Sequence, residues 1–126
     1  MTEAYLFLTT GFEEIEALST ADILRRAGVV LQTVSLTGGK TVEAAHGVKV
    51  QADELFENID PCAAEILIVP GGTTKFDEHD GLKKALKDFA AGGKPVAAIC
   101  AAPMVLGGWD CWKAKTPPAI PASSNI

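Results

Sequence analysis

The stretch KPVAAICAAPMVLG, residues 94–107, decides the fold because it places a strand directly before a helix. PVAAI is an apolar run of strand length, which is typical of a strand that is covered on both faces. Cys100 follows the strand at once, and AAPMVLG opens a helix. A strand that leads straight into a helix is the repeating unit of a parallel sheet, so the same unit is expected earlier in the chain.

Three earlier segments predict further strands. Residues 4–8 are a continuous apolar run of strand length, and the β-branched residues of 29–36 alternate in part with polar ones. Residues 65–72 predict a third buried strand, which ends in a glycine pair. Residues 41–50 predict a hairpin that turns at the dipeptide HG, and residues 53–64 predict a loop with a short helical turn. The fold class is therefore α/β, with a parallel sheet sandwiched by helices.

Two helices are expected between these strands. The first follows residues 4–8, where Thr10 and Glu13 have the spacing of a capping box, and it ends at Gly28. Its apolar stripe is predicted to consist of Ile15, Leu18, Ile23, Leu24 and Ala27. The second covers residues 80–91 and ends at a glycine pair. Its inward side chains are predicted to be Leu82, Ala85, Leu86 and Phe89.

Composition bounds the possible functions. A length of 126 residues predicts one domain. A net charge of −5 and a pI near 4.9 exclude non-specific nucleic-acid binding, which needs a basic face. No apolar run reaches membrane-spanning length and the N-terminus lacks the positive charge of a signal peptide, so a cytoplasmic protein is expected. Three unevenly spaced cysteines match no metal pattern, and no metal, cofactor or disulfide framework is expected.

Several candidate site residues fall where the strands of the sheet end, which is where open parallel sheets bind ligands. Cys100 follows PVAAI, and the neighbouring helix start favours its thiolate, so Cys100 is the candidate nucleophile. The N–H groups of Gly71, Gly72 and Ala101 are candidate donors to a developing oxyanion. Glu16, in an early turn of the first helix, is the candidate to donate a proton or to orient the sulfur.

Each of these features also fits a structural role. A cysteine in an apolar strand is about as often a small core residue as a nucleophile. Gly71 and Gly72 fit a plain turn, and Glu16 fits a solvated acid at a helix start. The three features together favour a site over their separate structural roles.

The other polar residues receive structural interpretations. Cys62 is expected to be a loop thiol, and His46 and His79 are expected to be solvated histidines in polar turns. Glu13 and Glu14 are expected to complement the helix dipole. A solvated helix face is predicted for Lys83, Lys84, Lys87 and Asp88.

The segments GFEEIEA, ADILRRAG, VPGG and AAICAAPMVLG resemble the DJ-1/PfpI (ThiJ) superfamily, particularly its bacterial DJ-1-like branch. The resemblance implies a flavodoxin-like sandwich and a homodimer. It matches the family's strand-to-helix cysteine to Cys100 and its first-helix glutamate to Glu16. It matches the family's turn near the nucleophile to Pro70, Gly71 and Gly72.

The resemblance also implies chemistry. The expected activity is that of a cysteine-dependent enzyme on small reactive aldehydes, a glyoxalase III-like or deglycase-like hydro-lyase. The thiolate of Cys100 would attack an aldehyde such as methylglyoxal to form a hemithioacetal, and the product would be a hydroxy acid such as lactate. The alternative is an oxidative-stress sensor or chaperone, in which Cys100 cycles through sulfenic and sulfinic states.

The resemblance covers residues 1–107 and then stops. A histidine or tyrosine that many members supply further on is missing, and residues 109–126 contain two Trp and three Pro without an apolar period. Reading each codon one base early from Gly108 forces the peptide Gly-Leu-Leu-Glu, similar to the family's segment there. Residues 1–108 are therefore expected to be a partial domain, and residues 109–126 an out-of-frame, disordered tail. A chain truncated in this way is expected to be marginally stable and inactive.

Overall fold

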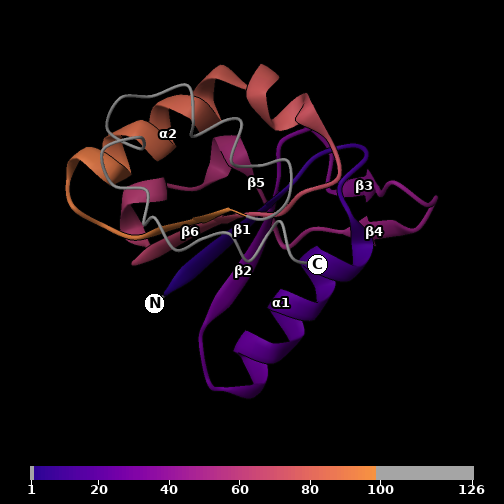
Figure 1. Ribbon diagram of the computed structural model, residues 1–126, viewed down its shortest axis with the longest axis horizontal. Helices are drawn as coiled ribbons and strands as arrows, with labels where there is room; N and C mark the ends of the chain where they lie inside the picture. The colour runs from indigo at the N-terminus through magenta and orange to yellow at the C-terminus, as the bar shows by residue number, and fades with distance from the viewer. Residues whose placement is uncertain (1, 99–126) are drawn as a thin grey trace, which may run out of the picture.

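The computed structural model describes residues 2–98, and these form an α/β layer structure. The strands of its larger sheet are β1 (Ala4–Leu8), β2 (Leu31–Ser35), β5 (Glu54–Leu55), β6 (Ile66–Val69) and β7 (Val96–Ala98). All neighbours pair in parallel, in the order β5-β2-β1-β6-β7. Figure 1 shows the helices α1 (Glu14–Arg26) and α2 (Asp80–Ala91) on opposite faces of this sheet. The predicted parallel sheet sandwiched by helices is confirmed.

The central strand, β1, explains why its sequence is apolar throughout. All five of its residues are buried, because one neighbour pairs on each side and a helix covers each face. Ala4 lies opposite Leu31 of β2 and opposite Ile66 of β6. Strand β6 is buried in the same way at Leu67, Ile68 and Val69.

Helix α1 begins differently from the prediction. Its N-cap is Glu13, whose Oε1 accepts hydrogen bonds from the N–H groups of Ile15 (2.7 Å) and Glu16 (3.2 Å). The capping box predicted for Thr10 and Glu13 is wrong. Gly11 lies between them with φ +91°, a left-handed conformation that a helix cannot contain.

The predicted apolar stripe of α1 is wrong in part. Leu24 packs against the core, but the exposed fractions of Ile15 and Ile23 are 73% and 62%, and Leu18 and Ala27 are also exposed. The residues that α1 buries are Glu14, Ala17 and Ala21. Two of these are alanines, so the helix axis can approach the sheet closely. The larger apolar side chains are left on the outer face.

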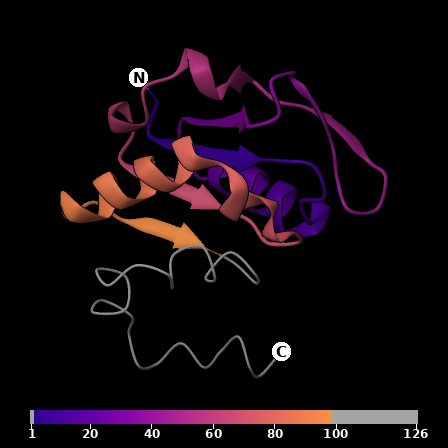
Figure 2. The same ribbon diagram turned by 90° about the horizontal axis from the view of Figure 1, so that it is seen from above.

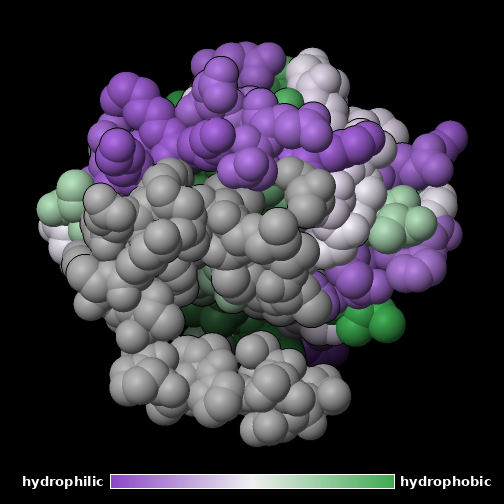
Figure 3. Space-filling view, turned by 45° about the horizontal axis from the view of Figure 1, so that its top comes forward, coloured by the Kyte–Doolittle hydropathy of each residue, from purple (hydrophilic) through white to green (hydrophobic). Residues whose placement is uncertain are grey.

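Helix α2 confirms its predicted pattern. Leu82, Leu86 and Phe89 are buried, and Ala85 is half-buried. The outer surface over this helix is hydrophilic in Figure 3. Of the predicted solvated face, Lys84, Lys87 and Asp88 are exposed and Lys83 is half-buried. Neither α1 nor α2, the α-helices of the described part of the chain, is long and apolar enough to cross a bilayer.

The predicted hairpin is present as β3 (Thr41–Glu43) and β4 (Lys49–Gln51), which pair antiparallel. Figure 2 shows that the arrows of the sheet point the same way, with this hairpin beyond their tips. Short 3-10 helices complete the described chain: η1 (Phe56–Asn58), η2 (Pro61–Ala63) and η3 (Thr74–Glu78). The hairpin therefore lies at the carboxyl edge of the sheet, where the candidate site is expected.

Candidate active site

The chain reverses its direction of travel across the sheet between β1 and β6. From β1 it moves to one side, through β2 to β5, and then returns to the other side of β1 as β6 and β7. In open parallel sheets such a switch point leaves a crevice beyond the carboxyl ends of the two strands. The loop of residues 9–13 follows β1 at this point, and Pro70, Gly71 and Gly72 follow β6.

Two hydrogen bonds join the start of α1 to the turn after β6. The N–H of Glu13 donates to the carbonyl oxygen of Gly71 (2.9 Å), and the N–H of Gly71 donates to Oε1 of Glu16 (3.0 Å). Glu16 is half-buried and Gly71 is buried. The structure thus brings together two of the predicted site residues, Glu16 and Gly71. Because this N–H already serves Glu16, the oxyanion role of Gly71 would require that bond to be released, and the role stays a prediction.

Gly72 lies tightly against the loop before α1. A Cβ atom built on Gly72 would lie 2.4 Å from the nitrogen of Glu13 and 2.8 Å from the oxygen of Gly11. Its φ of +103° also disfavours any residue with a side chain. Glycine is therefore required for the turn to seat against the start of α1.

The register of β7 places the end of that strand beside the same turn. Ala98 lies opposite Val69, and both strands run toward the carboxyl edge. Gly71 comes two residues after Val69, and Cys100 comes two residues after Ala98. Cys100 and Ala101 lie outside the described residues, so their predicted roles stay predictions.

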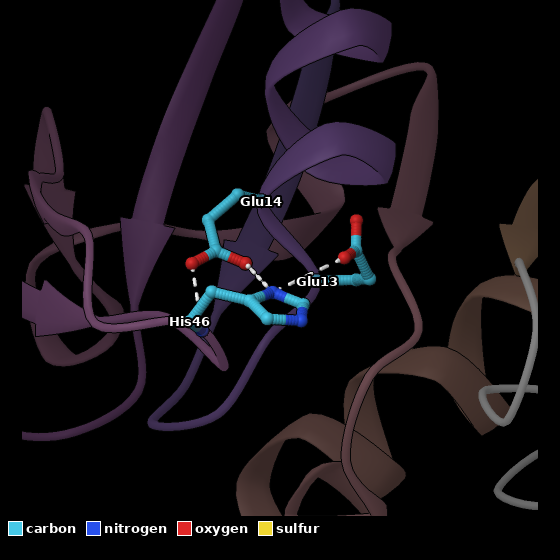
Figure 4. A group of neighbouring side chains, drawn as sticks. All are labelled: Glu13, Glu14 and His46. Atoms are coloured by element: carbon cyan, nitrogen blue, oxygen red, sulfur yellow. Dashed lines mark hydrogen bonds and ion pairs between the residues drawn. The ribbon is translucent and has the colours of Figure 1, made fainter.

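The hairpin is tied to the same region by residues that the sequence did not single out for function. His46 lies in the turn of this hairpin. Its backbone N–H donates to Oε2 of Glu14 (2.7 Å), and its Nδ1 lies 2.8 Å from Oε1 of Glu14 (Figure 4). The second carboxylate, Oε2 of Glu13, lies 3.5 Å from the same nitrogen. Two backbone hydrogen bonds also join the hairpin to the loop before α1. The N–H of Gly11 donates to the carbonyl oxygen of Glu43, and the N–H of Ala45 donates to that of Phe12. The start of α1 therefore connects the hairpin with the turn after β6.

Comparison with known proteins assigns the family. The sequence model of the DJ-1/PfpI family matches residues 2–124. The chain belongs to the DJ-1/PfpI family. Protein dj-1beta of Drosophila melanogaster is 33% identical over 106 residues, which are 82% of this chain and 57% of that protein. Protein/nucleic acid deglycase 2 of Escherichia coli strain K12 is 32% identical over 119 residues, which are 91% of this chain and 69% of that protein.

Solved structures agree with the sheet and helices of this DJ-1/PfpI chain. The crystal structure of Drosophila melanogaster DJ-1beta has a TM-score of 0.80 at 32% identity, and it covers 85% of this chain and 60% of that one. The oxidized DJ-1 of Toxoplasma gondii has a TM-score of 0.78 at 33% identity, covering 83% and 59%. The chain thus spans little more than half the length of these relatives. The family match also enters the segment after Gly108, where the change of reading frame stays a prediction.

The contact between Glu14 and His46 shifts the pKa of both groups toward their charged forms. Burial alone would raise the pKa of Glu14, but hydrogen bonds from the His46 ring and from backbone N–H groups lower this pKa to about 2. The hydrogen bond to Glu14 raises the pKa of His46, and the negative charges of Glu14 and Glu13 add to that effect against the opposing effect of desolvation. The carboxylate and the imidazolium therefore each favour the charged form of the other.

Replacing His46 by Asn should lower the melting temperature most between about pH 4.5 and 6.5. The contribution of Glu14 is present above its ordinary pKa of 4.5 and is lost as the pH falls toward 2. The contribution of His46 is complete below its ordinary pKa of 6.5 and is lost as the pH rises through the raised value. Thermal melts of both proteins across this range measure the difference, and a difference that does not vary with pH would contradict the ion pair.

The two predicted solvated histidines are corrected by their contacts. His46 is exposed, but its ring is paired with Glu14. His79 is half-buried, because its Nδ1 accepts the N–H of Leu82 (2.9 Å) as the N-cap of α2 and its ring packs edge-on against Phe56. Cys62 is an exposed thiol in η2, near the amino end of β6 and away from the candidate site.

Proposed function

We propose that this protein is a cysteine-dependent enzyme that acts on small reactive aldehydes, with Cys100 as its nucleophile. The observation that carries the proposal is the contact of Glu16 with Gly71 at the edge to which β7 leads, two residues before Cys100. An acid and a glycine turn beside the end of a strand are the surroundings that a nucleophilic thiol needs. Membership of the DJ-1/PfpI family and the deglycase among the relatives support the substrate class.

The reaction can be written without a cofactor. The thiolate of Cys100 adds to the aldehyde carbon of methylglyoxal, and the new alkoxide takes a proton to give a hemithioacetal. Glu16 then removes the hydrogen of that carbon as a proton while the hydroxyl proton passes to the ketone oxygen, which gives an enediol. Glu16 returns its proton to the neighbouring carbon, and loss of the remaining proton from the first oxygen leaves a thioester next to the new alcohol. Water cleaves the thioester to lactate and restores the thiol. The net change is the addition of one water.

The test of the proposed function is lactate release from methylglyoxal by the full chain, with a chiral assay of the product. The chain as written is compared with a version whose reading frame is restored after Gly108. The frame hypothesis predicts turnover in the restored version only, and equal turnover in both would overturn that hypothesis. Absence of lactate from both would overturn the proposed activity itself.

Replacing Glu16 by Gln should lower kcat/KM for methylglyoxal by about 10²- to 10⁴-fold, which is the contribution of a positioned general acid or base. The amide oxygen of Gln can still accept the N–H of Gly71, so the turn should keep its place. The matched control is Glu65→Gln, an exposed acid that precedes β6 at the opposite edge of the sheet. A similar small loss in both variants would exclude proton transfer by Glu16.

A second function is favoured by one comparison. The Toxoplasma gondii relative is described as oxidized, and a sensor or chaperone whose Cys100 is oxidised to the sulfinic acid fits such a relative. Mass spectrometry after mild peroxide treatment distinguishes the two functions. Selective sulfinate at Cys100 without aldehyde turnover favours sensing, and turnover with a reduced thiol favours the enzyme.

A further inference from the structure

The cluster of Glu13, Glu14 and His46 has the composition of a metal site. Its three ligand atoms, one from each side chain, all lie within 4.8 Å of one another, and all three residues belong to the described part of the chain. His46 Nδ1 is 2.8 Å from Oε1 of Glu14 and 3.5 Å from Oε2 of Glu13. In a tetrahedral zinc site with bonds of about 2.0–2.1 Å, ligand atoms are about 3.3–3.4 Å apart. The nitrogen–oxygen separation to Glu13 is within about 0.2 Å of that spacing, and the separation to Glu14 is shorter than it by about 0.6 Å.

Each carboxylate of the cluster is oriented by backbone groups. Glu13 uses Oε1 to cap the N–H groups of Ile15 and Glu16, which leaves Oε2 turned toward the imidazole (Figure 4). Glu14 uses Oε2 to accept the backbone N–H of His46, which leaves Oε1 turned toward the same nitrogen. Hydrogen bonds of this kind orient ligands in known metal sites. The three side chains therefore converge without needing an ion to hold them.

Charge and exposure separate this cluster from an ordinary group of surface acids. The ligands come from two segments that are far apart in the sequence, and one of them is an imidazole. The Glu14 side chain is only 10% exposed, whereas that of His46 is 73% exposed. Two carboxylates outweigh the partial charge of about +0.5 at a helix N-terminus. The arrangement thus offers negative charge on its buried side and an open position for water on its outer side.

We propose that Glu13, Glu14 and His46 bind a divalent transition metal ion of the zinc class. Carboxylate oxygen with imidazole nitrogen is a ligand set that suits Zn²⁺, and three protein ligands with an open fourth position form a recognised type of zinc site. The ion would replace the proton that His46 and Glu14 share. It would join the hairpin turn to the start of α1, in the place that the ion pair now occupies. The sequence predicts no metal site, so the structure alone suggests this one.

The test is isothermal titration calorimetry of the full chain with zinc chloride, which measures binding and does not depend on the aldehyde activity. Since thiols also bind zinc, the titration is carried out in a chain with Cys62, Cys100 and Cys111 changed to Ser. One ion should bind per chain. His46→Asn should weaken this binding by more than about tenfold, a loss that removal of even a supporting residue causes.

Two further variants keep the result interpretable. Glu13→Gln removes a charged ligand while its amide oxygen can still cap α1, so it carries the test if His46→Asn proves misfolded by circular dichroism. His79→Asn is the matched control, because His79 lies at the start of α2 and not in the cluster. Binding that is weakened by the cluster variants and unchanged in the control supports the site. Absence of binding, or equal binding in all variants, would overturn it.

Discussion

Replacing Cys100 by Ala should abolish lactate release from methylglyoxal, with kcat/KM lower by about a thousandfold or more. Alanine has no atom that can bond to the aldehyde carbon, so the hemithioacetal cannot form. The assay uses whichever form of the chain, as written or with its frame restored, turns over the aldehyde. The matched control is Cys62→Ala, which removes an exposed thiol in η2 at the opposite edge of the sheet.

The two cysteine variants separate a nucleophile from a general need for thiols. Activity in Cys62→Ala and none in Cys100→Ala is the expected pattern. Turnover that persists in Cys100→Ala would remove this cysteine from the reaction. Equal losses in both variants, with a native circular dichroism spectrum in each, would mean that no single thiol forms the covalent intermediate.

Replacing Gly72 by Ala should lower the free energy of unfolding by at least about 3 kcal/mol. The new Cβ would lie 2.4 Å from the nitrogen of Glu13, a backbone atom that cannot rotate away, and the residue would also have to adopt a φ of +103°. For a domain of this size the melting temperature should fall by about 12 °C or more. Differential scanning calorimetry measures this fall.

Gly28→Ala is the control for the backbone conformation alone. Gly28 has φ +92°, but a Cβ atom there would meet nothing within 4 Å. The expected loss is about 1–2 kcal/mol, the usual cost of a left-handed residue other than glycine. If the free energy of unfolding fell equally in the two variants, the close contact between Gly72 and the start of α1 would add nothing to the cost of the substitution.

The strands and α2 could be predicted because the apolar pattern of each is typical of one kind of element only. The central strands are apolar throughout because both of their faces are covered, and α2 spaces Leu82, Leu86 and Phe89 at the helical period before a glycine pair. For α1 the same reasoning was right for Leu24 only. Its large apolar residues Ile15 and Ile23 are exposed, and alanines face the sheet. Residue type alone does not show which face a neighbouring layer leaves room for.

The candidate site could be predicted only where the topology is local. The placement of Glu16 and Gly71 at one edge follows from the parallel sheet, since Gly71 follows β6 and Glu16 lies in the first turn of the helix that follows β1. The pairing of His46 with Glu14 could not be predicted, because it joins residues 32 positions apart through a hairpin turn whose direction the sequence does not specify. The only signal was a histidine in a turn, and most such histidines are solvated.

The position of β1 in the middle of the sheet has a consequence for synthesis on the ribosome. Its partner on one side, β2, follows after one helix, but its partner on the other side, β6, is 62 residues later, as Ala4 pairs with Ile66. At about 5–20 residues per second, the nascent chain would carry an unpaired apolar strand edge for about 3–12 s. Chaperone binding during translation should therefore be concentrated in the interval before residue 69 leaves the exit tunnel.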